Sequence, residues 1–260
     1  MSLNPKLHDW RGKTVWLVGA STGIGRATAA LLHKLGATVI VSARQQALLE
    51  AFVREHPGSE ALALDVLDAS ALKAAVLQLR ARHARLDLIV YAAGTYRPLS
   101  ALAFDRELAQ QHFDVNVGGA LNLLDAVLPW LLSQAAAGQG GHLSLISSIA
   151  ASRGLPKALA YGPSKAALTH LAEVLYLDLH PQGLGVSVIH PGFVATPLTA
   201  QNDFKMPAEI SAETAARAML DGWARGRFDI HFPRRFTGFL KMLRWLPDAL
   251  YFRFIARAKR

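Results

Sequence analysis

Apolar residues in this chain occur in short continuous runs that alternate with longer segments of helical periodicity. Short apolar runs bounded by turn residues are typical of buried strands, and we expect strands at residues 14–18, 38–41, 61–64, 86–92, 142–146, 185–189 and 228–232. Between them, apolar residues recur every three or four positions, which predicts helices. We expect these helices directly after the glycines at 19–25 and over residues 45–56, 69–84, 104–133, 158–179 and 212–224.

Strand and helix alternate without a break, and the strands are apolar on both faces. This combination predicts an α/β fold: a Rossmann-type, doubly wound, mostly parallel sheet with helices on both faces. The sequence shows no linker, repeat or low-complexity segment. We therefore expect a single domain over residues 1–232, followed by a C-terminal helical extension over residues 233–260.

Composition agrees with a large core and excludes several chemistries. The 260 residues are 52% hydrophobic and 18% charged, which is enough apolar material for a compact domain. The absence of cysteine excludes disulfides, thiolate nucleophiles and cysteine-bound metals, and we expect no metal site. The polar N-terminus and the lack of a long uninterrupted apolar stretch predict neither a signal peptide nor a transmembrane helix, so we expect a cytoplasmic protein.

The net charge of +9 is concentrated at one end of the chain. Residues 223–260 contain ten Lys or Arg and two Asp, so this end carries +8. Residues 1–222 hold eighteen basic and seventeen acidic residues, which leaves a body of +1. A basic end on a nearly neutral body needs an explanation separate from the fold.

A glycine-rich turn joins the first expected strand to the first helix. Glycine lets a backbone turn tightly and approach a pyrophosphate, and the helix that follows offers free N–H groups to the phosphates. Within a strand–helix–strand series this turn predicts a dinucleotide site, although glycines also occur in ordinary turns. The candidate cofactor-binding residues are Gly19, Ser21, Thr22, Gly23, Ile24 and Gly25.

The end of the second strand indicates which nicotinamide dinucleotide binds. Enzymes that use NAD usually carry Asp or Glu here, where it binds the ribose 2′-hydroxyl. This chain has Ala43 followed by Arg44, and an arginine can bind a 2′-phosphate with two hydrogen bonds. The pattern predicts NADP(H). The alternative is that Arg44 is a solvated residue at the start of the next helix.

Tyr161 and Lys165 are four residues apart, on one face of an expected helix. A nearby ammonium lowers a phenol's pKa, and the phenol can then exchange a proton with a carbonyl or an alcohol. Such pairs are also common on helix surfaces. However, Ser148 lies thirteen residues upstream, at a strand end where open α/β sheets bind ligands. Its hydroxyl can bind the reacting oxygen, and Ser147 is the second choice for this role.

These motifs together resemble the short-chain dehydrogenase/reductase family. The glycine spacing, the separation of Ser148 from Tyr161 and the Tyr-x-x-x-Lys pair carry the resemblance, which covers about residues 13–196. It implies that Asn116 is a fourth catalytic residue, holding a water that relays protons to Lys165. It also implies that Lys165 holds the nicotinamide ribose. The alternative for Asn116 is local bonding to the helix backbone.

The resemblance implies further cofactor contacts, at Asp65, Val66, Ala93, Gly94, Pro191, Gly192, Val194 and Thr196. Asp65 and Val66 match the family's adenine-contacting pair, although Asp65 can equally be an ordinary helix cap. The segment from Pro191 to Thr196 matches the part that lies beside the nicotinamide, although it can also be a plain turn.

Two positions depart from the family pattern. Val18 replaces the usual Thr before the first glycine, which costs one local hydrogen bond. The family usually has Asn-Asn-Ala-Gly after the fourth strand, whereas this chain has Tyr-Ala-Ala-Gly at 91–94. The second Asn normally supports the central sheet, so Ala92 puts that support in doubt.

The predicted function is hydride transfer between NADP(H) and a small-molecule carbonyl or alcohol of apolar character. Ser148 and Tyr161 would bond the reacting oxygen, where negative charge develops. Residues 195–207 are expected to form a lid, and we expect a homodimer or homotetramer. The rival interpretations are a catalytically silent NADP-binding sensor and a membrane-surface interaction protein on the same fold.

The basic extension carries two apolar stripes at helical spacing. One stripe contains Phe236, Phe239, Leu240 and Leu243, and the other contains Leu250, Phe254 and Ala258. The surrounding cations are Arg235, Lys241, Arg244, Arg253, Arg257, Lys259 and Arg260. A helix of this kind can lie on an anionic membrane surface, which would place the protein at the inner face of a membrane. Alternatively, the stripes pack on the core or on a partner subunit. No motif indicates nucleic-acid binding.

Overall fold

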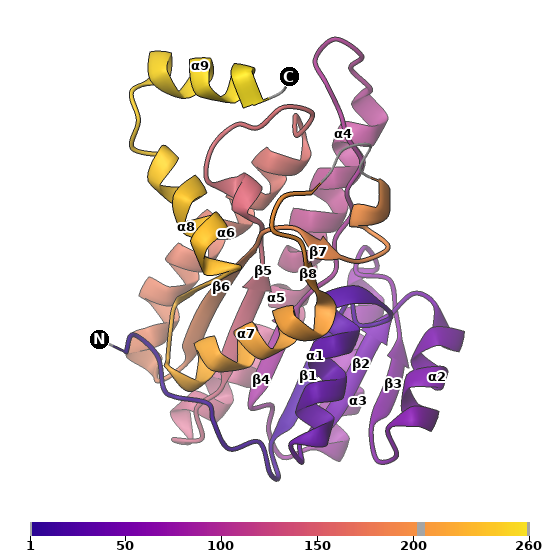
Figure 1. The fold of residues 1–260 in the computed structure, drawn as a ribbon. Helices are drawn as coiled ribbons and strands as arrows, with labels where there is room; N and C mark the ends of the chain where they lie inside the picture. Colours follow the sequence, from indigo (N-terminus) through magenta and orange to yellow (C-terminus); the bar gives the residue numbers. More distant parts are fainter. Residues whose placement is uncertain (1, 202–205, 259–260) are drawn as a thin grey trace.

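The computed structural model describes residues 2–201 and 206–258, and its centre is a seven-stranded parallel sheet (Figure 1). The strands are β1 (Thr14–Val18), β2 (Thr38–Ala43), β3 (Glu60–Ala63), β4 (Leu88–Tyr91), β5 (His142–Ile146), β6 (Gly185–Pro191) and β9 (Asp229–Phe232). Their order across the sheet is β3-β2-β1-β4-β5-β6-β9. The chain changes winding direction between β1 and β4, and in such sheets ligands bind at the carboxyl ends of the strands beside this point.

Helices cover both faces of the sheet (Figure 1). They are α1 (Gly23–Lys34), α2 (Gln46–Glu55), α3 (Ala69–Arg82), α4 (Arg106–Phe113), α5 (Gly119–Ala136), α6 (Tyr161–Leu179), α7 (Ala212–Ala224), α8 (Arg234–Leu243) and α9 (Asp248–Ala258). Buried side chains of α3, α5 and α6 form one apolar cluster, and those of α1, α2 and α7 form another. Within β1, Trp16 and Val18 join the first cluster, whereas Val15 and Leu17 join the second. The predicted doubly wound fold is confirmed.

The predicted helix over 104–133 is divided in the structure. Helix α4 ends at Phe113, a π-helical turn spans Asp114–Gly118, and α5 continues to Ala136. The sequence did not reveal this turn, because a π turn is a local bulge inside a helix that otherwise continues. This turn contains Asn116.

Two further segments differ from prediction. The helix expected from residue 158 begins at Tyr161, with Pro163 in its first turn, where a missing N–H leaves no hydrogen bond unmade. A short parallel pair that we did not predict, β7 (Val194–Ala195) with β8 (Ile210–Ser211), joins the two ends of the expected lid. Residues 202–205 of that lid lie outside the described residues.

Among the described residues, one helical stretch, Arg106–Ala136, is long and apolar enough to cross a bilayer. Half of its most apolar window is buried inside the protein, and Leu123, Val127 and Trp130 of α5 belong to the core beside the sheet. The stretch is therefore accounted for as a core helix of this fold.

The expected C-terminal extension forms α8 and α9, which lie at the carboxyl edge of the sheet (Figure 1). Arg153, just before α6, donates hydrogen bonds to the Leu243 carbonyl at 3.3 Å and the Leu246 carbonyl at 2.7 Å. Its guanidinium also lies 3.9 Å from the ring centre of Tyr251. One guanidinium thus attaches both helices to the segment that enters α6.

The expected apolar stripes are only partly buried. In α8, Leu243 is buried but Phe239 is exposed. In α9 the buried side chain is Tyr251, whose hydroxyl donates to the Gly154 carbonyl at 2.8 Å, whereas Leu250 and Phe254 are exposed. Of the alternatives for the Leu250 stripe, packing on this chain's own core is not found, because Arg153 and Gly154 contact the Tyr251 side of α9 instead. Packing on a partner subunit and contact with a membrane stay predictions.

Candidate active site

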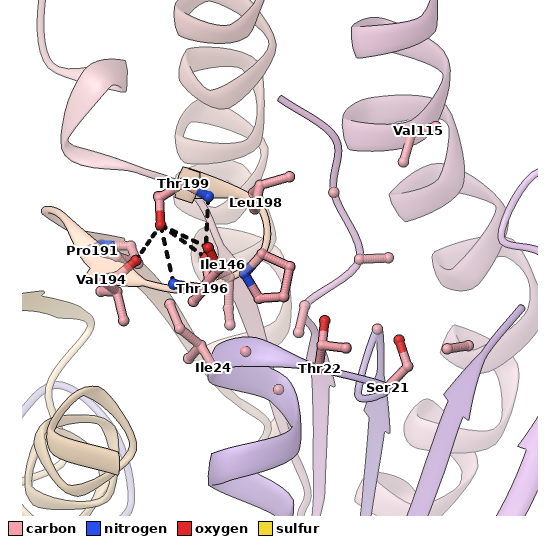
Figure 2. A pocket seen from close by; sticks show the side chains of 18 of the residues that line it. Ser21, Thr22, Ile24, Val115, Ile146, Pro191, Val194, Thr196, Leu198 and Thr199 are labelled. Atoms are coloured by element: carbon pink, nitrogen blue, oxygen red, sulfur yellow. Dashed lines mark hydrogen bonds between the residues drawn. The ribbon is translucent and has the colours of Figure 1, made fainter. Parts of the chain in front are cut away.

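A cavity of about 460 Å³ lies at the carboxyl edge of the sheet (Figure 2). Every residue predicted to bind the cofactor lines it: Gly19, Ser21, Thr22, Gly23, Ile24, Gly25, Arg44, Asp65, Val66, Ala93, Gly94, Tyr161, Lys165, Pro191, Gly192, Val194 and Thr196. Ser148 lines it as well, and Asn116 lies behind the wall, next to the lining residue Val115. The structure therefore brings together segments that follow β1 to β6.

The glycine turn has no room for side chains at two positions, so its bare backbone can approach a pyrophosphate. A Cβ on Gly19, where φ is +96°, would lie 2.2 Å from the Ala93 nitrogen, and one on Gly25 would lie 2.3 Å from the Gly19 carbonyl oxygen. Only glycine fits at these two positions. Thr22 precedes α1 without capping it through its side chain, so the first N–H groups of the helix remain available beside the cavity.

The far end of the cavity carries Arg44, which is exposed. Within residues 2–201 and 206–258 it makes no ion pair, so its guanidinium can accept an anion. Asp65 also lines this end, and its carboxylate accepts from the Leu67 N–H at 3.0 Å. The N-cap of α3 is Asp68, which accepts from the Ala71 N–H at 2.9 Å. The alternative that Asp65 caps this helix is therefore wrong.

Tyr161 and Lys165 meet the cavity from the first turns of α6. Nζ of Lys165 donates to the Ile146 carbonyl at 2.9 Å, and burial lowers the pKa of this lysine to about 7. Burial raises the pKa of Tyr161 to about 12, opposed by a hydrogen bond with Ser148. The expectation that Lys165 lowers the pKa of Tyr161 is therefore wrong. Nζ lies 5.9 Å from the centre of the ring, and desolvation is the larger effect.

Asn116 is completely buried and joins three parts of the site. Its side-chain oxygen accepts from the Thr95 N–H at 2.8 Å, and its amide nitrogen donates to Ser164 Oγ at 2.9 Å. It thus ties the π turn to the loop after β4 and to α6, rather than bonding its own helix. A Cβ on Gly94 would lie 3.1 Å from Asn116 Oδ1 and 3.2 Å from Lys165 Nζ. Glycine at 94 therefore leaves room in front of both polar groups.

The departure at Ala92 leaves the sheet supported by other bonds. The Ala92 N–H donates to the Val18 carbonyl at 2.7 Å, which extends the β1–β4 pairing beyond the strand end. The buried Tyr91 hydroxyl donates to the Val115 carbonyl at 2.5 Å. Tyr91 therefore connects β4 to the π turn, which carries Asn116.

Ser147 and Ser148 face different neighbours. The Ser148 hydroxyl accepts from the Ala150 N–H at 3.2 Å and hydrogen-bonds with Tyr161. The Ser147 hydroxyl donates to the Lys165 carbonyl at 2.7 Å and lies 2.9 Å from Thr169 Oγ1. Ser148 is therefore the serine placed beside the tyrosine, and Ser147 holds α6 from behind.

A hydrogen-bond network that the sequence did not reveal continues from Thr169. Its hydroxyl lies 3.0 Å from His190 Nε2, and His190 Nδ1 donates to Asp229 at 2.9 Å. Lys241 of α8 forms an ion pair with the same carboxylate. Burial opposes ionisation, but His190 and Lys241 hold the pKa of Asp229 well below its usual range. The network links α8 to the backbone of Lys165.

Aromatic residues and a bonded loop enclose the space next to Tyr161. The Tyr96 ring lies edge-on to the Tyr161 ring with their centres 4.9 Å apart, and the buried His112 ring lies at 6.3 Å. After β6, Thr199 Oγ1 donates to the Val194 carbonyl at 2.6 Å and accepts from the Thr196 N–H at 3.1 Å (Figure 2). These bonds fold residues 194–199 over one side of the cavity. Neither aromatic residue stands in a motif that sequence reasoning recognises.

A doubly wound sheet with a glycine turn and a Ser–Tyr–Lys set at its carboxyl edge defines a class of dinucleotide-dependent oxidoreductases. The model of the short chain dehydrogenase family matches residues 13–206 of the chain. The chain belongs to this family, as the sequence motifs predicted, and the family uses NAD(P)(H) for hydride transfer. Residues 207–260 lie beyond the match.

Relatives agree with this assignment but differ in substrate. An uncharacterized oxidoreductase of Myxococcus xanthus (strain DK1622) is 35% identical over 243 residues, which are 92% of this chain and 94% of the relative. D-erythrulose reductase of Gallus gallus is 34% identical over 190 residues, 73% of this chain and 74% of the relative. A short chain dehydrogenase from Burkholderia cenocepacia J2315 in complex with NADP has a TM-score of 0.82 at 25% identity, covering 94% of this chain and 98% of its own.

Proposed function

We propose that this protein transfers hydride between NADP(H) and an apolar carbonyl or alcohol, with Tyr161 as the general acid and base. The observation that carries the proposal is the convergence of Ser148, Tyr161 and Lys165 on one wall of the cavity. The glycine turn lines the same cavity. The reacting oxygen and the dinucleotide would therefore share one enclosed space.

The protein's own residues supply the acid–base part of the reaction. The nicotinamide, when bound, supplies or accepts the hydride. Ser148 and Tyr161 donate hydrogen bonds to the substrate oxygen, where negative charge develops during reduction. Tyr161 then gives its proton to this oxygen. Lys165 holds the ribose, and Asn116 connects it to a proton-relaying water.

The preference for NADP(H) over NAD(H) rests on Arg44 and on the absence of a carboxylate at position 43. An unpaired guanidinium beside the adenosine end would bind a 2′-phosphate with charge-assisted hydrogen bonds. A carboxylate in its place would repel that phosphate. The NADP complex of the Burkholderia cenocepacia relative supports the same preference.

We also propose that the protein is a homodimer or homotetramer. Leu121 and Leu132 of α5 and Leu177 of α6 are exposed on the outer side of the sheet's helical layer. Exposed apolar side chains on neighbouring helices are typical of subunit contacts. Light scattering on the purified protein tests this, and a monomeric mass at micromolar concentration would contradict it.

A screen of NADPH oxidation tests the catalytic proposal. Purified protein is assayed with apolar ketones, aldehydes, quinones and steroid-like compounds, each with NADPH and with NADH. We expect turnover with at least one carbonyl and a higher kcat/KM with NADPH. Tight NADPH binding without turnover of any compound would instead support a silent sensor, and a preference for NADH would contradict the role of Arg44.

A further inference from the structure

Helices α8 and α9 carry large apolar side chains that are exposed to solvent. We call this set the tail face: Phe239, Met242, Trp245, Leu250, Phe252 and Phe254. Trp245 is 85% exposed, although it is the residue type with the largest apolar surface to bury. The Phe239 and Phe254 rings touch edge-on with their centres 6.0 Å apart, which makes the two helices' contributions continuous. Exposed apolar side chains that gather on neighbouring helices in this way mark an interaction surface.

The cations around the tail face have no carboxylate partners in the described part of the chain. They are Arg234, Arg235, Arg244, Arg253 and Arg257, all exposed. Residues 233–260 contain eight basic residues and one acidic residue, Asp248, and that aspartate is already paired with Arg153. The surface therefore combines exposed aromatic side chains with uncompensated positive charge.

The tail face lies at the same edge of the sheet as the cavity. Arg153 and Gly154 hold α8 and α9 against the segment before α6, and that segment pairs with the loop after β4 through Leu99 and Ala158. The loop after β4 exposes Leu102 and Phe104. In Figure 1 this loop and α9 both project at the upper end of the view, on either side of the strand ends. Apolar groups thus flank the cavity on two sides.

We propose that the tail face docks on the surface of an anionic lipid bilayer, with the mouth of the cavity turned toward the membrane. Aromatic residues and leucines would enter the headgroup boundary, and the arginines would pair with anionic headgroups. Charge decides against a second copy as the occupant. Two tail faces in contact would bring together segments that each carry +7 over residues 233–260.

The docked orientation also defines a substrate class, and this part rests on the proposed reductase function. A carbonyl or alcohol dissolved in the bilayer would reach Tyr161 from the membrane side. The Tyr96 ring beside Tyr161 and the apolar residues among the cavity lining suit a substrate with a hydrocarbon body. A water-soluble sugar would gain nothing from this arrangement.

Sedimentation with lipid vesicles tests the docking without any assay of activity. The full-length protein is mixed with vesicles of phosphatidylcholine alone and of phosphatidylcholine with phosphatidylglycerol. We expect sedimentation with the anionic vesicles only, and its loss at high salt, because salt screens the arginines from the headgroups. No sedimentation, or equal sedimentation with both vesicles, would overturn the proposal.

Matched variants separate the tail face from the protein's overall charge. The triple variant R244Q/R253Q/R257Q should weaken partitioning on the order of a hundredfold, since each cation near the surface contributes about 1 kcal/mol. The control K34Q/R54Q/R80Q removes the same charge from the C-terminal turns of α1, α2 and α3, at the opposite edge of the sheet, and should bind normally. Equal loss in both variants would contradict a defined docking surface.

Two further measurements test the apolar side chains of the tail face and the alternative that this face is a subunit contact. Trp245→Ser with Phe252→Ser should weaken vesicle binding while circular dichroism and NADPH fluorescence stay as in the wild type. Light scattering of R244Q/R253Q/R257Q should show an unchanged oligomeric state. A change of oligomer without any effect on vesicle binding would assign the tail face to a subunit contact and overturn the membrane proposal.

Discussion

Tyr161 and Lys165 share one buried environment, and burial acts against the charged form of each. It raises the pKa of the tyrosine to about 12 and lowers that of the lysine to about 7. At neutral pH the tyrosine therefore keeps its proton, which is the state that can protonate an oxygen during reduction. The reverse reaction requires the phenolate, and so it should gain rate as the pH rises.

Removal of the Tyr161 hydroxyl tests this acid directly. Tyr161→Phe should lower kcat by a factor of about 10²–10⁴, the usual contribution of a positioned general acid. NADPH affinity, measured by fluorescence titration, should change little because the ring remains. Tyr176→Phe is the matched control. Tyr176 lies further along α6, and its hydroxyl donates to the Leu3 carbonyl of the N-terminal segment. Residual activity near the wild-type level in Tyr161→Phe would refute the assignment.

Arg44 allows an equally direct test of cofactor preference. Arg44→Ala removes the guanidinium proposed to hold the 2′-phosphate, so the KM for NADPH should rise about ten- to hundredfold. The KM for NADH should stay the same, because NADH has no 2′-phosphate. Arg54→Ala, at an exposed position of α2, is the control. Equal effects on the KM values of the two cofactors would mean that Arg44 does not bind the 2′-phosphate.

At the scale of elements, the sequence predicted strands and helices well and their special features poorly. The predicted bounds of β1, β5 and α7 are those of the structure, because each has a continuous apolar pattern between clear turn residues. The π turn around Asn116 was not predicted, because it is a local bulge inside a helix that otherwise continues. In α9 the spacing grouped Leu250 with Phe254 as one apolar stripe, but the side chain that Arg153 buries is Tyr251.

The sequence likewise predicted some residues of the candidate site and not others. Its motif residues could be named because their spacing is local and resembles a known family. The Ser147–Thr169–His190–Asp229 network could not, because it draws one residue from each of four separate elements. Only the strand order places β6 between β5 and β9 and so brings these side chains together.

This network crosses elements and should position Lys165 without touching substrate. In Asp229→Asn the carboxylate that anchors His190 and Lys241 is lost, so the support behind the Lys165 carbonyl should loosen. We expect kcat to fall about tenfold, with NADPH affinity nearly unchanged and the pH profile of kcat displaced.

Two variants distinguish positioning from a general loss of structure. Asp229→Glu should recover part of the rate, because it restores a carboxylate to the network. His231→Asn changes a neighbouring histidine of β9 that bonds Thr237 instead, and should leave kcat unchanged. A parallel fall of kcat, NADPH affinity and melting temperature in Asp229→Asn would show a purely structural role.

At the scale of the whole molecule, the two edges of the sheet have different tasks. The carboxyl edge holds the cavity and the tail face. The amino edge is closed by the N-terminal segment, where the Asn4 side chain bonds both the carbonyl and the N–H of Val186 at 2.7 and 3.0 Å. His142 begins β5 at this edge and is buried, with Nε2 bonded to Ser187 Oγ at 2.9 Å. Side chains at this edge are therefore expected to act on stability rather than on catalysis.

His142 should make the stability of the whole protein sensitive to acid. Burial lowers its pKa from 6.5 to about 3. Between these values the unfolded chain binds a proton that the folded protein does not, so the free energy of unfolding falls as the pH drops below 6.5. The loss is about 1.4 kcal/mol per pH unit until the pH reaches the pKa of His142 in the folded protein.

In His142→Gln this contribution disappears, so urea midpoints measured from neutral pH down to about pH 4 should decline less steeply than in the wild type. His170→Gln, an exposed histidine of α6, should decline like the wild type. Parallel pH profiles for His142→Gln and the wild type would show that another group controls the acid sensitivity.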